Sequence, residues 1–243
     1  GGYPDVKLGH RAAAVLASVG QGRTLRDALD TLGLDGNEPV GGFVKSGSPV
    51  VDIDGLKVTV VGPLEAQLEA LRKDWKKTKP RSAKEAAYAD ESVANLSSIV
   101  CHVAYKAKSG AKRTLLLTGD ARGDYLLEGL KEAGLLKNGK LKVDLLKVQH
   151  HGSDRNVEQG FFEQVLADHY VISANGKHGN PDVPTLEWLI KARDKDRYTL
   201  HISNKLPWME AFFTEQRKGG RQFEVIYRGE PDDDTSIDII DLD

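Results

Sequence analysis

The chain has almost no cysteine and no long apolar run. Its 243 residues include one cysteine, Cys101, which excludes an intramolecular disulfide and a cysteine-rich zinc cluster. We expect Cys101 to be a buried, inert thiol, which fits a reducing, cytoplasmic compartment. No apolar stretch approaches the roughly 18 residues of a membrane-spanning helix, so we expect no membrane partner. The net charge of −2 means that nucleic-acid binding would need a local basic patch.

The remaining composition is that of a globular domain. Hydrophobic residues make up 40% of the chain and charged residues 29%, an ordinary balance between a core and a solvated surface. The length suits one large domain, so we expect a single domain over residues 1–243. The chain opens at Gly1 without a methionine, and its only methionine is Met209. We therefore expect this domain to be incomplete at its amino terminus.

The spacing of apolar residues predicts helices that alternate with strands. Residues 50–63 read as a hairpin that turns at Asp54-Gly55, and the Ala-rich segment 80–95 as a mobile loop. The tail, 235–242, alternates like an edge strand. We expect helices over residues 7–34, 64–79, 123–133, 161–166 and 185–193, and strands over 99–105, 113–118, 141–148, 169–173, 198–203, 211–214 and 222–227. This order predicts an α/β fold with a mixed sheet covered by helices.

Two of the expected strands end at residues that are able to bind a metal. The apolar run 114–119 stops at Asp120, and the apolar run 144–149 stops at His150-His151. Ligands of α/β folds bind beyond the carboxyl ends of strands, so we expect these three side chains to converge. The plainer alternatives are an Asp120 that caps the following helix and a histidine pair that is satisfied at a loop entrance.

The histidine pair is followed by Gly152, which permits the chain to turn. Adjacent residues on a strand point to opposite faces, but a turn after the strand can redirect both. One imidazole would then bind a metal, while the other would orient it, contact the substrate or move a proton. We also place Ser153, the next residue, among the expected substrate contacts.

A third candidate is the loop at residues 173–181, which is rich in glycine and asparagine. Such a loop lets the backbone approach a ligand closely. His178 is either a second ligand or substrate contact, or an ordinary loop histidine. Lys177 and Asn175 are suited to contact a phosphate or a carboxylate. We therefore expect Asn175, Lys177 and His178 at the substrate.

In this order and spacing, residues 95–98, Thr118-Gly119-Asp120 and residues 147–153 resemble motifs of the metallo-β-lactamase superfamily. The similarity is to the branch that contains the hydrolase domain of the DNA-uptake protein ComEC, and it covers about residues 50–205. It implies a four-layer αβ/βα sandwich with one or two metal ions, usually zinc and sometimes manganese. Asp120 would be the bridging ligand, and His151, with His150 beside it, would complete the catalytic set of this chain.

The chain departs from that family in one respect. The family's motif His-x-His-x-Asp-His occurs nowhere among the seven histidines. We therefore expect the first strands of the fold to precede residue 1, with the motif supplied by an upstream segment or by a partner chain. The alternative is a natural pseudo-enzyme.

Three functions follow from these patterns. The first is a metal-dependent hydrolase, a phosphodiesterase or nuclease that acts on a nucleic acid or nucleotide by metal-activated hydroxide. The basic segment 72–81 would be a strip that binds the substrate backbone, or simply a solvated helix face. The second is a catalytically degenerate module that binds or regulates within a larger complex. The third is an unrelated α/β domain with coincidental motifs.

Overall fold

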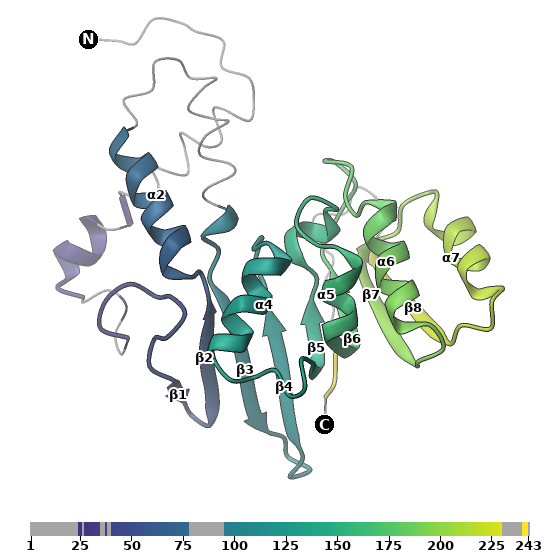
Figure 1. Ribbon diagram of the computed structural model, residues 1–243, viewed down its shortest axis with the longest axis horizontal. Coiled ribbons are helices and arrows are strands. Elements are labelled where there is room, and N and C mark those ends of the chain that lie inside the picture. The colour runs from purple at the N-terminus through teal and green to yellow at the C-terminus, as the bar shows by residue number, and fades with distance from the viewer. Residues whose placement is uncertain are drawn as a thin grey trace, which may run out of the picture.

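The computed structural model describes residues 24–25, 27–34, 37, 40–77, 95–229 and 240–242 (Figure 1). Its centre is one mixed sheet in which strand order follows sequence order from β1 to β8. Strands β1 to β4 pair antiparallel, and β4 to β8 pair parallel. The strands are β1 (Val51–Ile53), β2 (Leu56–Gly62), β3 (Val100–Lys106), β4 (Lys112–Leu117), β5 (Leu141–Lys147), β6 (Val165–Ile172), β7 (Tyr198–Asn204) and β8 (Phe223–Gly229).

The helices that join the parallel strands share one face of the sheet. Parallel strands in sequential order need crossovers of one hand, and right-handed crossovers keep returning to the same face. Figure 1 shows α4, α5 and α6 in front of the strands. The helices are α2 (Glu65–Lys77), α4 (Gly123–Glu132), α5 (Gln159–Gln164), α6 (Val183–Arg193) and α7 (Met209–Arg217). Among the described residues, no helix is long and apolar enough to cross a membrane.

The hydrophobic core lies between these helices and the sheet. One row of paired residues crosses four strands and faces the helices, and each of its side chains is fully buried: Leu116, Leu146, Tyr170 and Leu200. Helices α4 and α5 cover this row with apolar residues that are buried in the same cluster, such as Leu126 and Phe162. The alternation of strand side chains turns the neighbouring row to the opposite face.

That opposite face carries apolar side chains that are open to solvent. Leu117 at the end of β4 is 42% exposed, and Ile99 just before β3 is 53% exposed. Leu115 and Leu145 pair on the same face and are more buried. The described part of the fold is therefore a sheet with its crossover helices on one side and, beside the end of β4, exposed apolar side chains on the other.

The predicted α/β fold with a mixed sheet is confirmed. The hairpin is also confirmed: Asp54 and Gly55 have φ values of 51° and 89° and join β1 to β2. Residues 27–32 are helical, and Gly33 ends that helix at φ 63°. The expected loop at 80–95, apart from residue 95, and the tail up to residue 239 lie outside the described residues.

One predicted element type and one predicted boundary are wrong. Residues 211–214 form the middle of α7 instead of a strand, because Met209 and Phe213 lie one helical turn apart and are both buried in the core. A four-residue apolar run cannot be assigned from its spacing alone. The expected helix at 161–166 ends at Gln164, and Val165 begins the longer strand β6.

Candidate functional site

The two strand ends that carry Asp120 and the histidine pair lie side by side. Strands β4 and β5 are parallel neighbours, and the segments beyond them are hydrogen-bonded to each other. Thr118 Oγ1 donates to the carbonyl oxygen of Lys147 at 2.7 Å. The backbone N–H of His150 donates to the carbonyl oxygen of Gly119 at 3.1 Å. The structure therefore brings these sequence-predicted residues to one edge of the sheet.

Both histidines stand in a tight turn, η1 (Gln149–Gly152), with left-handed backbone conformations. Their φ values are 42° for His150 and 58° for His151, a region that costs about 1–3 kcal/mol for residues other than glycine. The carbonyl oxygen of His150 accepts hydrogen bonds from Ser153 N at 3.0 Å and Asn180 Nδ2 at 3.2 Å. The surroundings thus hold a strained turn in place, as is common at functional sites.

Gly152 permits this turn, as the sequence predicted. Its φ is 82°, and a Cβ atom at this position would lie 2.8 Å from Cβ of Pro181. Its carbonyl oxygen accepts from the N–H of Asp182 at 3.0 Å. Asn180, in the loop at 173–181, and Asp182, just after it, therefore both fasten this segment against the histidine turn.

The imidazole of His150 is oriented by a buried asparagine. Nδ1 of His150 lies 2.7 Å from Oδ1 of Asn156, and Nδ2 of Asn156 donates to the carbonyl oxygen of Asp120 at 2.9 Å. Because the amide nitrogen is committed to that carbonyl, the amide oxygen is the atom that faces His150. It can only accept, so Nδ1 carries the proton and Nε2 presents a lone pair.

The imidazole of His151 is held in the same tautomer as that of His150, but by a different partner. Its Nδ1 lies 2.5 Å from the carbonyl oxygen of Ser173. A carbonyl oxygen only accepts hydrogen bonds, so here too Nδ1 carries the proton and Nε2 is left as the acceptor. The two ring centroids are 6.0 Å apart, with 66° between the ring planes.

Asp120 sits beside this pair. Its backbone N–H donates to Oγ of Ser98 at 3.1 Å, which links the segment before β3 to the end of β4. Its side chain is half-buried. In the described part of the chain, no hydrogen bond to the Asp120 carboxylate is found, so the structure does not support the alternative in which this side chain caps α4. The residue before α4 is Arg122, and the helix has no side-chain cap.

Lys147 adds a positive charge under the site. Its Nζ donates to the carbonyl oxygens of Val148 at 3.2 Å and Gly119 at 3.4 Å. Burial lowers the pKa of this ammonium group, while the negative charge of Asp120 acts in the opposite direction. Sequence reasoning named Lys147 only as part of a motif. The signal was a lysine at the end of an otherwise apolar strand.

Three donors suited to a borderline metal ion, two imidazole Nε2 atoms and one carboxylate, lie in this region. Neutral imidazoles held through Nδ1 by a hydrogen-bond acceptor are the usual form of histidine ligands. Within residues 24–77, 95–229 and 240–242, as far as they are described, no three His, Cys, Asp or Glu side chains lie close enough to hold one ion. The donor chemistry therefore fits zinc, but the described residues do not form a complete centre by themselves.

The remaining predicted contacts lie at the rim or below the surface. Lys177 and His178 are exposed, and the backbone N–H of Lys177 donates to Oδ1 of Asn175 at 3.1 Å, which shapes the loop. Ser153 is 5% exposed, and its Oγ accepts from Arg155 N at 3.4 Å. It serves the turn and offers a substrate little access. Asn156, which sequence reasoning missed, has no motif around it that could have indicated its role.

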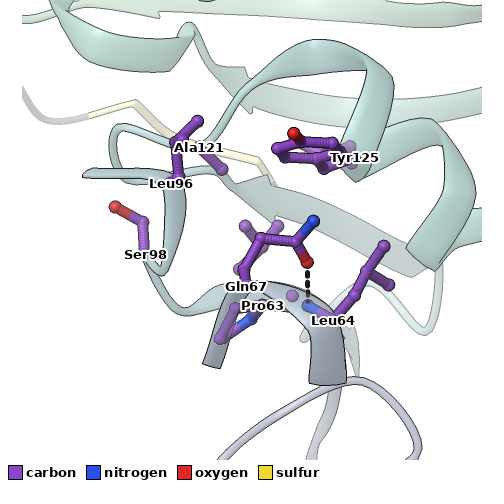
Figure 2. Close-up of a pocket in the computed structure, with 10 residues that line it drawn as sticks. Pro63, Leu64, Gln67, Leu96, Ser98, Ala121 and Tyr125 are labelled. Carbon is purple, nitrogen blue, oxygen red and sulfur yellow. Dashed lines mark hydrogen bonds between the residues drawn. The ribbon is translucent and has the colours of Figure 1, made fainter. Parts of the chain in front are cut away.

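A small hollow borders the site on the side of α2 and α4 (Figure 2). Its lining includes Ser98 and Ala121, the neighbours of Asp120, together with Tyr125 and Leu126 of α4. Gln67 closes one side, and its Oε1 accepts from Leu64 N at 3.0 Å. The space is about 210 Å³ including its open mouth, with room for about one water molecule. This hollow is too small for a nucleotide.

Comparison with models of known families, with curated proteins and with solved structures finds no match to this chain.

Proposed function

We propose that the chain belongs to a metal-dependent hydrolase, a phosphodiesterase or nuclease, with Asp120, His150 and His151 at its centre. The observation that carries this is the tautomer that the two imidazoles share. Each Nδ1 is held by a fixed acceptor, so both Nε2 atoms are available as acceptors at the strand end next to that of Asp120.

The finer fold belongs to the same proposal. A four-layer αβ/βα sandwich consists of two sheets that pack face to face, with helices outside. The described sheet has its crossover helices on one face and exposed apolar side chains such as Leu117 on the other. This supports the idea that a second αβ half covers the apolar face, contributed by residues outside those described or by a partner chain.

In this proposal Asp120 and His151 hold one or two zinc ions, or manganese, and ligands outside the described residues complete the centre. A bound ion supplies a low-pKa water and positive charge for the developing oxyanion. The residues of this chain do the rest. Asn156 and the Ser173 carbonyl keep both imidazoles in one tautomer. Lys147 places positive charge near Asp120, and the Nε2 lone pair of His150 would be a further ligand beside that of His151.

The test uses the protein expressed from its complete open reading frame. Metal content and hydrolysis of single-stranded DNA and of a simple phosphodiester are measured for the wild type, Asp120→Ala and His151→Ala. We expect both variants to lose bound metal and at least about 100-fold in activity, since each removes a ligand. Asp168→Ala, at an aspartate of β6 that forms an exposed pair with Lys142, is the matched control. Full activity in both ligand variants would remove the proposal.

The second candidate, a binding or regulatory module, is favoured by one observation. Ile99 and Leu117 are large apolar side chains exposed on the helix-free face of the sheet, and such patches mark interaction surfaces. Metal content separates the two candidates. Stoichiometric metal that is lost in Asp120→Ala supports the hydrolase. A folded intact protein without metal supports the module.

A further inference from the structure

Asn156 connects the two halves of the candidate site through its side chain. It follows the histidine turn, is 7% exposed, and reaches both strand ends. Oδ1 meets Nδ1 of His150 at 2.7 Å, and Nδ2 meets the backbone carbonyl of Asp120 at 2.9 Å. One amide group therefore contacts the imidazole that follows β5 and the backbone of the carboxylate that follows β4.

The backbone of Asn156 is fixed as firmly as its side chain. Its N–H donates to the carbonyl oxygen of Ser153 at 3.3 Å, and its own carbonyl oxygen accepts from Gly123 N at 2.7 Å. Gly123 is the first residue of α4, so the start of that helix, the loop after the turn and the end of β4 meet at one residue. An amide held at both ends has little freedom to flip and exchange its donor for its acceptor.

The orientation of the amide determines the chemistry of His150. Nδ2 has a carbonyl oxygen as its partner, and a carbonyl oxygen can only accept. Oδ1 is then the atom that faces the imidazole, and only an Nδ1–H can satisfy it. A neutral imidazole with its proton on Nδ1 has its lone pair on Nε2. Without Asn156, nothing among the described contacts of His150 would select this tautomer.

We propose that Asn156 is a positioning residue: it fixes His150 as the Nδ1–H tautomer, so that Nε2 is the acceptor atom offered at the site, and it ties that ring to the backbone of Asp120. Only the purpose of this tautomer, which is to prepare Nε2 of His150 for a metal ion or a proton, rests on the proposed function. The tautomer itself is a property of the metal-free chain.

The tautomer is read directly by long-range ¹H–¹⁵N correlation NMR of the imidazole rings in the metal-free protein. The pH is set near 8.5, above the ordinary imidazole pKa of about 6.5, and the His150 signals are assigned with His150→Gln. We expect the wild type to show a protonated Nδ1 and an unprotonated Nε2 on His150. A wild-type His150 with its proton on Nε2 would overturn the proposal without any variant.

Two substitutions test the cause. Asn156→Asp keeps an oxygen acceptor for Nδ1, so His150 should remain in the Nδ1–H form. Asn156→Leu removes the acceptor, so the Nε2–H form should gain population. His151 is the internal control, because its partner is the Ser173 carbonyl and its tautomer should not change in either variant. A folded Asn156→Leu protein with an unchanged His150 tautomer would refute the role of Asn156.

A second readout separates this inference from the proposed function. Zinc binding to the intact protein is titrated for the same variants, and Asn156→Leu should weaken it by about 10–100-fold, the usual effect of losing a residue that orients a ligand. If the tautomers behave as expected but the intact protein binds no metal, the hydrolase proposal fails and the positioning role of Asn156 stands. If zinc binds and the wild-type tautomer is Nε2–H, the positioning role of Asn156 fails and the hydrolase proposal stands.

Discussion

Gly129 of α4 lies directly against the backbone of Val61 in β2. A Cβ atom at position 129 would approach the carbonyl oxygen of Val61 well inside 3.0 Å, closer than real Cβ atoms come to any neighbour. Glycine is therefore required at this point of helix–sheet contact. It sets how closely α4 sits on the sheet, and α4 begins three residues after Asp120.

Gly129→Ala should lower the free energy of unfolding by about 1–3 kcal/mol, because the added methyl group forces helix and strand apart. Urea denaturation followed by circular dichroism measures this. Gly160→Ala is the matched control. Gly160 lies in α5 with nothing within 4 Å of its Cβ position. Alanine at this position should therefore raise the free energy of unfolding by about 0.5–1 kcal/mol. Equal effects at both positions would contradict the close-contact argument.

Asp144 joins β4 to β5 where their ladder is short. Only Leu115 and Leu116 of β4 pair with β5, and the Asp144 carboxylate accepts from Thr114 N at 2.8 Å, from Thr114 Oγ1 at 3.0 Å and from Arg113 at 3.2 Å. Burial would raise the pKa of Asp144, but these hydrogen bonds and the Arg113 charge outweigh it, and the pKa is lowered.

Asp144→Ala should destabilise the chain by about 1–3 kcal/mol at pH 7, because it leaves the N–H of Thr114 without its partner. The contribution is present above the unfolded pKa of about 3.9 and is lost as the pH falls through the lowered pKa of the folded chain. Asp168→Ala is the control, since Asp168 forms an exposed pair with Lys142 and should cost at most about 1 kcal/mol. Urea denaturation at pH 7 measures the free energy of unfolding of both variants. A similar loss in both would contradict the role given to the Asp144 hydrogen bonds.

His102 should make the free energy of unfolding depend on pH at higher pH values than Asp144 does. It is 6% exposed, and burial, together with the nearby charge of Lys112, lowers its pKa. The unfolded chain then binds more protons below about pH 6.5, so the free energy of unfolding should fall as the pH drops from about 6.5 through the lowered pKa. Above that range both states are neutral and the effect is absent.

The readout for His102 is the slope of stability against pH between about 7.5 and 5, from urea titrations at each pH. His102→Gln should flatten this slope, whatever it does to stability at pH 7.5. His178→Gln, in the exposed loop, should leave the slope as it is in the wild type. An unchanged slope in His102→Gln would show that another group is responsible.

The sequence predicted those parts of the fold in which pattern and burial coincide. The strands that lead to Asp120 and His150 are apolar runs that end abruptly, and the structure forms both as strands that pair in parallel. The segment at 211–214 was assigned to the wrong class, because Phe212 and Phe213 also fit a helix whose buried face includes Met209. Only contacts with the core decide between these two arrangements.

The site was less predictable than the strands. Spacing located Asp120 and the histidine pair, but not the direction in which the imidazoles point. That direction depends on two left-handed backbone conformations and on Asn156, whose position in the sequence carries no periodic or motif signal. Ser153 is buried in the turn, where its N–H donates to the His150 carbonyl oxygen, and its role as a substrate contact stays a prediction.

Arg193, at the end of α6, provides the last prediction. Its side chain is 4% exposed, and Nη1 donates to the carbonyl oxygen of Ala167 at 2.5 Å and to the hydroxyl of Tyr170 at 2.7 Å, while Nε meets Asp196 at 3.1 Å. A lysine has one ammonium group in place of this planar fork.

Arg193→Lys should therefore lower the free energy of unfolding by about 1–3 kcal/mol, since part of this buried set of acceptors loses its donor. Arg197→Lys is the control, because Arg197 is exposed and bonds only Gln222 among the contacts described, and it should stay within about 0.5 kcal/mol. Urea denaturation at pH 7 measures both. If Arg193→Lys is as stable as the wild type, the fork is not what holds the end of α6 to β6, and a positive charge over the Tyr198 ring, which lysine can also supply, must be sufficient.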